Sequence, residues 1–239
     1  MNAPGFFTRG IRYELPHPPI DLRVILLVNA TIAKAFDILR ASPPAGFDLR
    51  NASEDEITRQ LHSVIENRLR RTHEVAGFDS RAFGRVTRAP EVTNYDRKHP
   101  AKKPDLFFDL KRESLPVLSD QDGIFVECKP VDENHSIVSD YCRAGMSRFA
   151  IGDYAWAMKQ AMMVAYVRDG HSIPRSLISV TPSIQRELQT TRWLVSVSNG
   201  RAAGQSDDLH VSEHKRNFSW FNGQRACKIQ IYHSWHPCN

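Results

Sequence analysis

Two short apolar segments constrain the fold of this 239-residue chain more than any other feature. Residues 106–110 (LFFDL) and 124–129 (IFVECK) have the length and composition of β-strands. The polar stretch between them ends in Asp122-Gly123, a turn signal. A connection of this length between two strands is most simply explained by an antiparallel pair with a long loop. The chain is therefore expected to build a sheet on which its helices pack.

Helical patterns lie on both sides of these two segments. Residues 53–71 show the clearest helix, because Ser53 and Glu56 form a capping-box pattern and apolar residues then recur at helical spacing. Residues 21–41 predict a long, mostly apolar helix, although its first residues also fit a strand. An apolar helix with a wide buried face is expected over 153–169.

Further strands complete the predicted secondary structure, at residues 84–92, 177–180, 193–198 and 226–235. The central order is helix, three strands, helix, strand, which indicates a mixed α/β domain. We divide the chain into an N-terminal helical extension (1–50), a core (51–182) and a C-terminal β-rich extension of the same domain (183–239).

Composition excludes several classes of protein. Apolar residues make up 41% and charged residues 25%, an ordinary globular balance. The longest apolar run, 161–167, is far shorter than the roughly 20 residues that a membrane helix needs. The first residues lack the basic and apolar regions of a secretory signal. The four cysteines include no Cys-x-x-Cys pair, which favours reduced thiols and a cytoplasmic location.

Charged residues on the two short strands form the candidate active site. Asp105 opens the first strand, and Glu127-Cys128-Lys129 closes the second. Because side chains two apart in a strand share a face, Glu127 and Lys129 point to the same side. Two carboxylates and the Cys128 carbonyl suit Mg²⁺ or Mn²⁺, which would acidify a bound water. Lys129 can orient that water and stabilise developing charge, so the set predicts phosphodiester hydrolysis.

Through Pro104-Asp105 and Glu127-Cys128-Lys129, the chain resembles the PD-(D/E)XK nuclease superfamily, which has a restriction-endonuclease-like fold. The resemblance implies an αβββαβ core over roughly half the chain, with Asp105 and Glu127 as metal-binding acids and Lys129 as the motif lysine. It also implies a metal-dependent endonuclease that hydrolyses DNA in restriction, phage defence or repair. Such proteins commonly act as homodimers or in larger complexes.

Two further groups of residues are expected near this site. Many members of the superfamily add a glutamate from the first helix, and Glu56 is the candidate here, with Glu66 second, although capping alone explains Glu56. The formal charge of +5 permits a polyanionic partner. Basic residues that cluster just before Asp105 are expected to contact the phosphate backbone: Arg97, Lys98, Lys102 and Lys103.

Several alternatives stay open. The chain could instead be a catalytically inactive protein of the same fold that binds nucleic acid or a partner within a larger complex. RNA is as compatible with the residues as DNA. Zinc-ligating residue types gather near the C-terminus, but their spacing matches no compact zinc motif: His210, His214, Cys227, His233, His236 and Cys238.

Overall fold

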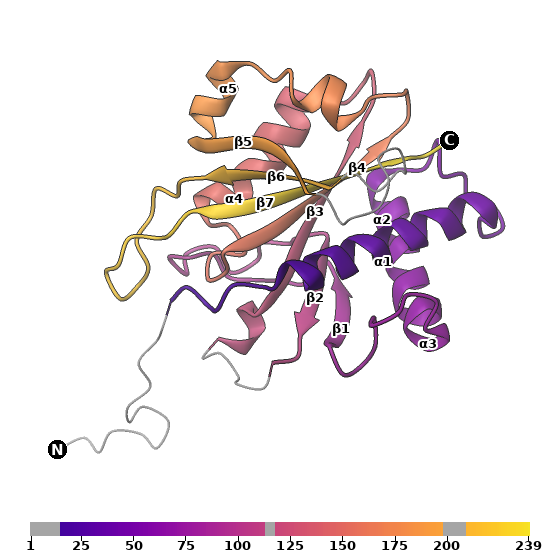
Figure 1. Cartoon of the computed structure of the whole chain (residues 1–239), viewed down its shortest axis with the longest axis horizontal. Helices are drawn as coiled ribbons and strands as arrows, with labels where there is room; N and C mark the ends of the chain where they lie inside the picture. Colours follow the sequence, from indigo (N-terminus) through magenta and orange to yellow (C-terminus); the bar gives the residue numbers. More distant parts are fainter. Residues whose placement is uncertain (1–14, 113–117, 198–208) are drawn as a thin grey trace.

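A seven-stranded mixed sheet forms the centre of the computed structural model, which describes residues 15–112, 118–197 and 209–239 (Figure 1). The strand order is β1-β2-β3-β4-β7-β6-β5. Strands β3, β4 and β7 run parallel, and the outer pairs on both sides are antiparallel. The strands are β1 (Phe83–Arg88), β2 (Leu106–Leu110), β3 (Gly123–Val131), β4 (Gln160–Val167), β5 (Thr190–Val197), β6 (Leu209–His214) and β7 (Ile229–Pro237). The predicted mixed α/β class is confirmed.

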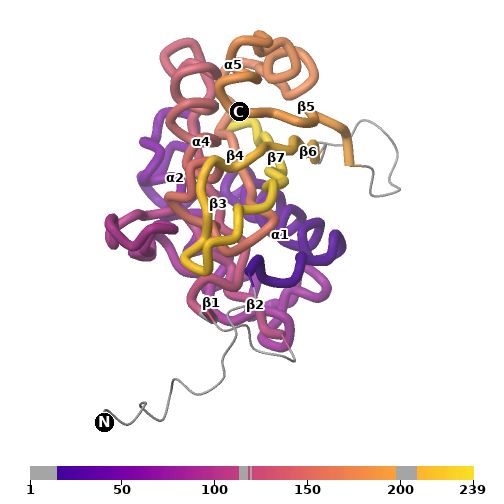
Figure 2. The backbone as a smooth tube through the Cα atoms, turned by 90° about the vertical axis from the view of Figure 1, so that its left-hand side faces the viewer, coloured from indigo at the N-terminus to yellow at the C-terminus, as the bar shows by residue number. Residues whose placement is uncertain are grey.

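Helical segments precede, interrupt and follow the strands. The N-terminal group is α1 (Leu22–Ala41), α2 (Glu54–Val64), a π-helical turn (Ile65–Leu69) and α3 (Arg70–Thr72). A π-helical segment (Ile137–Met146) continues into α4 (Ser147–Ile151) between β3 and β4. Shorter pieces are a 3₁₀ turn (Ser119–Gln121), a π-helical turn (Ile173–Leu177) and α5 (Pro182–Glu187). In Figures 1 and 2, β1 and β2 lie at the opposite end of the molecule from β5 and α5.

The two faces of the sheet carry different helices. The ring of Phe36 in α1 stacks on His236 with 4.5 Å between ring centroids, and Thr58 in α2 lies 2.7 Å from the Tyr166 hydroxyl. On the other face, the hydroxyl of Tyr141 lies 3.0 Å from Nδ1 of His233. Since neighbouring strand residues alternate between faces, α1 and α2 cover one side and residues 137–151 the other.

Local signals predicted the first half of the fold correctly. Helix α2 begins at the capping box, in which the Glu56 backbone N–H donates to Ser53 Oγ at 3.3 Å. Asp21 caps α1 by accepting from the Arg23 backbone N–H at 2.8 Å. Strands β2 and β3 pair antiparallel, with Phe107 opposite Phe125. The two predicted helices and the predicted strand pair are therefore confirmed.

The helix predicted over 153–169 is wrong, because residues 160–167 form β4. All eight residues of this strand are buried, since β4 lies between β3 and β7 and has helices on both sides. A parallel strand buried on both faces has a continuous apolar sequence without alternation. Such a run cannot be distinguished from a buried helix by periodicity alone.

The second helix of the core lies earlier in the chain than predicted. It spans residues 137–151, begins at Ser136, whose hydroxyl accepts from two backbone N–H groups, and ends at Gly152 with φ 81°. The strand predicted at 177–180 is also wrong, because Leu177 ends a π-helical turn and the residues after it form no strand. The placement of the αβββαβ order expected from the sequence is thus incorrect in its second half.

The C-terminal strands belong to the same sheet as the first four. Strand β7 pairs with β4 on one side and with β6 on the other, and β6 pairs with β5, so these three strands extend the sheet rather than forming a separate layer. Within the described part of the chain, no helix combines the length and apolar character needed to cross a membrane.

Candidate active site

The pairing of β2 with β3 brings Asp105 beside Cys128. Leu106 lies opposite Val126 in the antiparallel register, so Asp105 sits just beyond the paired residues. Its Oδ2 accepts a hydrogen bond from the Cys128 backbone N–H at 2.6 Å. A strand residue directs its N–H and C=O to the same neighbour. The Cys128 carbonyl therefore lies on the same side of β3 as the Asp105 carboxylate.

Glu127 is the most enclosed acid of the site. Its side chain is 1% exposed, and its Oε1 lies 3.2 Å from Nζ of Lys129 on the same face of β3. Arg148 of α4 approaches the same oxygen at 3.5 Å. The hydroxyl of Tyr154 donates a hydrogen bond to Oε2. Two cations and a phenol thus compensate one buried carboxylate, as a charge removed from water requires.

Glu54 supplies a third carboxylate from the first turn of α2. Its Oε1 accepts a hydrogen bond from Nζ of Lys129 at 2.7 Å. Lys129 therefore bridges Glu54 and Glu127, and its side chain is only 12% exposed. The structure thus gathers Asp105, Glu127 and Lys129, which the sequence placed together, and adds Glu54 to them.

The charges of these groups perturb one another strongly. Burial raises the pKa of Asp105 to about 7, with the charge of Glu127 adding to the shift. Burial also raises the pKa of Glu127, although Lys129 and Arg148 oppose the change. Burial would lower the pKa of Lys129, but the charges of Glu127 and Asp105 and the Glu54 hydrogen bond outweigh it and raise the pKa. Perturbed acids with specific charged partners are typical of functional sites.

Three site residues escaped the sequence analysis: Glu54, Arg148 and Tyr154. Arg148 and Tyr154 lie on α4 and in the loop that follows it, where the sequence had predicted the end of a loop and the start of another helix. Gly152 ends α4. Arg148 therefore lies in this helix and Tyr154 in the loop that leads from it to β4. Glu54 gives no signal of its own in the sequence, because an acid in the first turn of a helix is already explained by the helix N-terminus.

The two glutamates proposed from the first helix have other roles. Glu56 closes the capping box, with its Oε2 accepting from the Ser53 backbone N–H at 2.9 Å and from its hydroxyl at 2.8 Å. Glu66 forms an ion pair with Arg70 at 2.7 Å and accepts from the Val86 backbone N–H at 2.7 Å. The structure therefore brings Glu54, and neither of these residues, to Lys129.

The basic residues before Asp105 lie in the segment that joins β1 to β2. Three of them form ion pairs: Lys102 with Asp153 at 2.9 Å, Lys103 with Glu91 at 3.0 Å, and Lys98 with Asp96 at 3.9 Å. The guanidinium carbon of Arg97 lies 5.1 Å from the centroid of the Phe221 ring. Lys98 is largely exposed, with its side chain 78% accessible. A contact with phosphate remains a prediction for all four.

The donor set fits a hard divalent cation. Burial, with the charge of Glu127 second, raises the pKa of Asp105, and a cation bound at the two carboxylates would offset their negative charge. The Cys128 carbonyl adds a third oxygen on the same side as Asp105. Oxygen donors of this kind are those that Mg²⁺ and Mn²⁺ prefer. No described group combines three or more His, Cys, Asp or Glu side chains placed to hold a metal ion.

Comparisons of the chain with protein-family models, curated proteins and solved structures find no match. The resemblance to PD-(D/E)XK nucleases therefore rests on the motif residues of the sequence alone and stays a prediction.

Proposed function

We propose that this chain is a metal-dependent nuclease that hydrolyses phosphodiester bonds in DNA. The observation that carries the proposal is that Asp105, Glu127, Lys129 and Glu54 lie together near the C-terminal end of β3. Acidic side chains on apolar strands have no packing reason to be there, and burying them is costly. The binding of a cation and a phosphate at this site would explain why these acids are buried.

In this mechanism, Asp105, Glu127 and the Cys128 carbonyl would hold Mg²⁺ or Mn²⁺. A metal bound there would supply acidification of a water molecule and compensation of charge on the phosphate. Lys129 orients the attacking water and stabilises the negative charge that develops on the phosphate oxygens. Glu54 holds the Lys129 ammonium in place. Tyr154 and Arg148 hold the carboxylate of Glu127 in place.

The arrangement of the strands supports the same proposal. Between Glu54 and Val167 the elements run helix, three strands, helix, strand, and Asp105 and Lys129 lie near the neighbouring ends of β2 and β3. The three C-terminal strands enlarge this unit to seven strands. A cytoplasmic role in restriction, phage defence or repair, as a homodimer or within a larger complex, is the biological setting that we propose.

One observation favours a second candidate function. Three groups already compensate the carboxylate of Glu127: Tyr154, Lys129 and Arg148. A buried charge that is fully compensated by the protein needs no bound cation. In that case the chain is an inactive nuclease-fold protein that binds nucleic acid or a partner. Such a protein would tolerate the loss of Lys129 without losing affinity.

Cleavage of supercoiled plasmid and single-stranded DNA tests the proposal. The full chain is assayed with Mg²⁺ or Mn²⁺ and with EDTA, alongside Asp105→Ala and Lys129→Ala. We expect cutting only with metal and a loss of at least about a hundredfold in both variants, as for other groups that stabilise developing charge. Single-stranded RNA in parallel assays decides between the two nucleic acids.

Controls come from α1, which carries an acid and a lysine away from the site. Asp37→Ala and Lys34→Ala remove exposed charges of the same types and are expected to cut at the wild-type rate. If the wild type binds DNA but does not cut it with either metal, the inactive binding protein is the better account. If Asp105→Ala cuts as fast as the wild type, the assigned site is wrong.

A further inference from the structure

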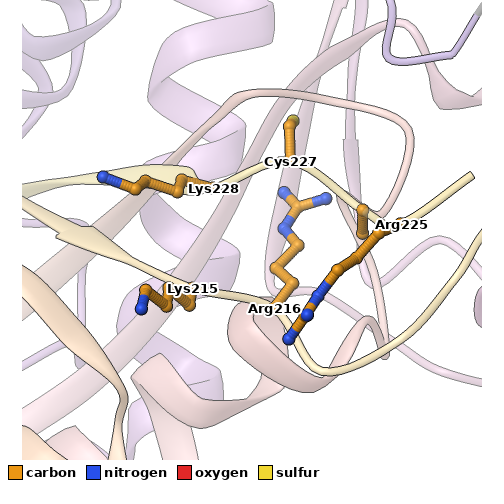
Figure 3. A pocket seen from close by; sticks show the side chains of 6 residues that line it. Lys215, Arg216, Arg225, Cys227 and Lys228 are labelled. Atoms are coloured by element: carbon orange, nitrogen blue, oxygen red, sulfur yellow. The ribbon is translucent and has the colours of Figure 1, made fainter.

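A second site lies between the end of β6 and the start of β7, outside the candidate active site. A pocket of about 290 Å³ lies there, and Figure 3 shows the two extended segments that border it. Its lining consists of Lys215, Arg216, Arg225, Ala226, Cys227 and Lys228. Four of these six residues are basic and none is acidic. The volume is near the lower limit for small-molecule pockets, so it suits a compact ligand.

Arg216 is the buried centre of this pocket. The residue is only 1% exposed, which is exceptional for an arginine. Its guanidinium donates to the backbone carbonyls of Trp156 at 2.8 Å, Met158 at 2.7 Å and Ala155 at 3.1 Å. Its Nε is buried and has no hydrogen-bond partner among the described residues. Burial lowers the pKa of Arg216 to about 10, and no carboxylate offsets that burial.

The other basic side chains add charge without internal compensation. Lys215 and Arg225 are exposed and form no ion pair or side-chain hydrogen bond within the described residues. Lys228 pairs with Glu213 at 2.8 Å, outside the lining. In Figure 3, Arg216 extends from one segment toward Cys227, and Arg225 extends back toward Arg216. The fold thus places four basic residues around one pocket whose lining contains no acid.

The pocket shares one loop with the candidate active site. Arg216 holds the carbonyls of Ala155, Trp156 and Met158, and Tyr154 immediately before them donates to Glu127. A ligand that contacts Arg216 therefore lies next to the loop that positions a site acid.

We propose that the pocket lined by Lys215, Arg216, Arg225 and Lys228 binds a phosphate group. Arginine recognises phosphate through several donors at once, and lysine adds a point charge. The unpartnered Nε of Arg216 and the two uncompensated side chains of Lys215 and Arg225 supply the donors. The group is either a phosphodiester of a nucleic acid strand or a free phosphate, and the two sources are separated by the experiment below.

Binding of a short labelled single-stranded DNA, measured by fluorescence anisotropy in EDTA over a range of salt concentrations, tests the nucleic-acid source. The variant is Lys215→Ala with Arg225→Ala, which leaves the buried Arg216 and its carbonyl contacts intact. We expect the affinity to fall about tenfold, and the slope of log affinity against log salt to decrease by about one. Arg71→Ala with Arg186→Ala removes two other exposed arginines and is expected to change neither.

Alkylation of Cys227 reports on the pocket itself. Cys227 lines it and is partly exposed, whereas the other three cysteines are buried. We expect inorganic phosphate, and separately the DNA, to slow its modification several-fold in the wild type but not in the double variant. Protection by phosphate with no DNA binding supports the site and assigns it to free phosphate. No protection by either probe overturns the proposal, and so does protection that persists unchanged in the double variant.

This experiment is independent of cleavage. It runs without divalent metal and can be repeated in Asp105→Ala, so a protein that binds phosphate here but cuts nothing contradicts only the nuclease proposal. A protein that cuts DNA while Cys227 stays unprotected contradicts only the phosphate pocket.

Discussion

Nζ of Lys129 lies 2.7 Å from Oε1 of Glu54, which joins the end of β3 to the first turn of α2. The carboxylate of Glu54 is among the groups that raise the pKa of Lys129, and it holds the ammonium in one position. We predict that Glu54→Gln lowers the cleavage rate about tenfold or more, because a mobile lysine stabilises the transition state poorly. Initial rates of plasmid nicking in Mg²⁺ measure the effect.

Glu56→Ala is the matched control, since it removes a glutamate two residues away on the same helix. It breaks the capping box with Ser53 and is expected to lower the free energy of unfolding by about 1 kcal/mol. Its cleavage rate should equal that of the wild type below the melting temperature. Equal loss of activity in both variants would show that α2 acts only through stability.

The hydrogen bond from Tyr154 to Glu127 gives a second prediction. Tyr154→Phe keeps the ring and removes the donor, so the pKa of Glu127, which this bond lowers, should rise further. We expect a loss of about 2 kcal/mol in the free energy of unfolding, as for a hydrogen bond to a charged group. Urea denaturation at pH 8 checks this value. The pH at which cleavage is half-maximal should move to higher pH.

Tyr166→Phe provides the comparison for Tyr154→Phe. Its hydroxyl lies 2.7 Å from Thr58, a neutral partner on the other face of the sheet. The expected cost is about 1 kcal/mol, with no shift of the pH profile. A pH profile that moves equally in both variants would contradict a specific role for Tyr154.

The sequence predicted the elements whose signals are local. The capping box at Ser53 defined α2, and the apolar segments around Asp105 and Glu127 defined β2 and β3 together with their antiparallel pairing. The sequence does not predict strand β4, because β4 is buried by strands that pair with it on both sides. No local pattern in the sequence shows that pairing. Because the apolar run at 160–167 also fits a buried helix, the predicted order assigns the second core helix to it and not to residues 137–151.

The residues of the candidate site also divide into those that a local sequence signal reveals and those that only the tertiary fold reveals. Asp105, Glu127 and Lys129 could be found because they share a short motif on adjacent strands. Glu54, Arg148 and Tyr154 come to the site from α2, α4 and a loop, so only the tertiary fold brings them together. The buried Arg216 likewise depends on carbonyls far away in sequence.

A chain of buried histidines gives a prediction about acid stability. His214 Nδ1 faces the Leu188 carbonyl at 3.1 Å, and its Nε2 lies 2.7 Å from the Ser212 hydroxyl. Ser212 also lies 2.8 Å from Nε2 of His233, whose Nδ1 faces Tyr141. Because a carbonyl only accepts, the donors run in one direction from Tyr141 to Leu188, with both imidazoles neutral. Burial lowers the pKa of His214 to about 4 and also lowers that of His233.

The sign follows from which state binds the proton. Below pH 6.5 the unfolded chain protonates His214, while the folded protein excludes the proton down to about pH 4. Each such histidine therefore removes about 1.4 kcal/mol of stability per pH unit in that window. Urea midpoints between pH 7.5 and 4.5 measure the slope. His214→Asn should reduce it, while His73→Asn, at an exposed position, should not; equal slopes in all three proteins would sink the idea.

The raised pKa of Asp105 predicts that this carboxyl group makes the stability of the folded protein depend on pH. An unfolded aspartate has a pKa of 3.8, whereas burial and the charge of Glu127 raise the pKa of Asp105 to about 7 in the folded protein. Between these values only the folded state holds the proton. The contribution of this carboxyl to stability is therefore complete below about pH 4 and is lost as the pH rises through 7.

Asp105→Asn tests this directly, because the amide oxygen can still accept from the Cys128 backbone N–H but carries no charge. In EDTA at pH 8 we expect the variant to be more stable than the wild type by on the order of 2 kcal/mol, and equally stable near pH 4. Adding Mg²⁺ at pH 8 should raise the melting temperature of the wild type only, since a ligand stabilises the state that binds it. A variant that is less stable than the wild type at pH 8 would show that Asp105 is held by favourable contacts rather than under repulsion. That result would remove the electrostatic reason for placing a cation beside it.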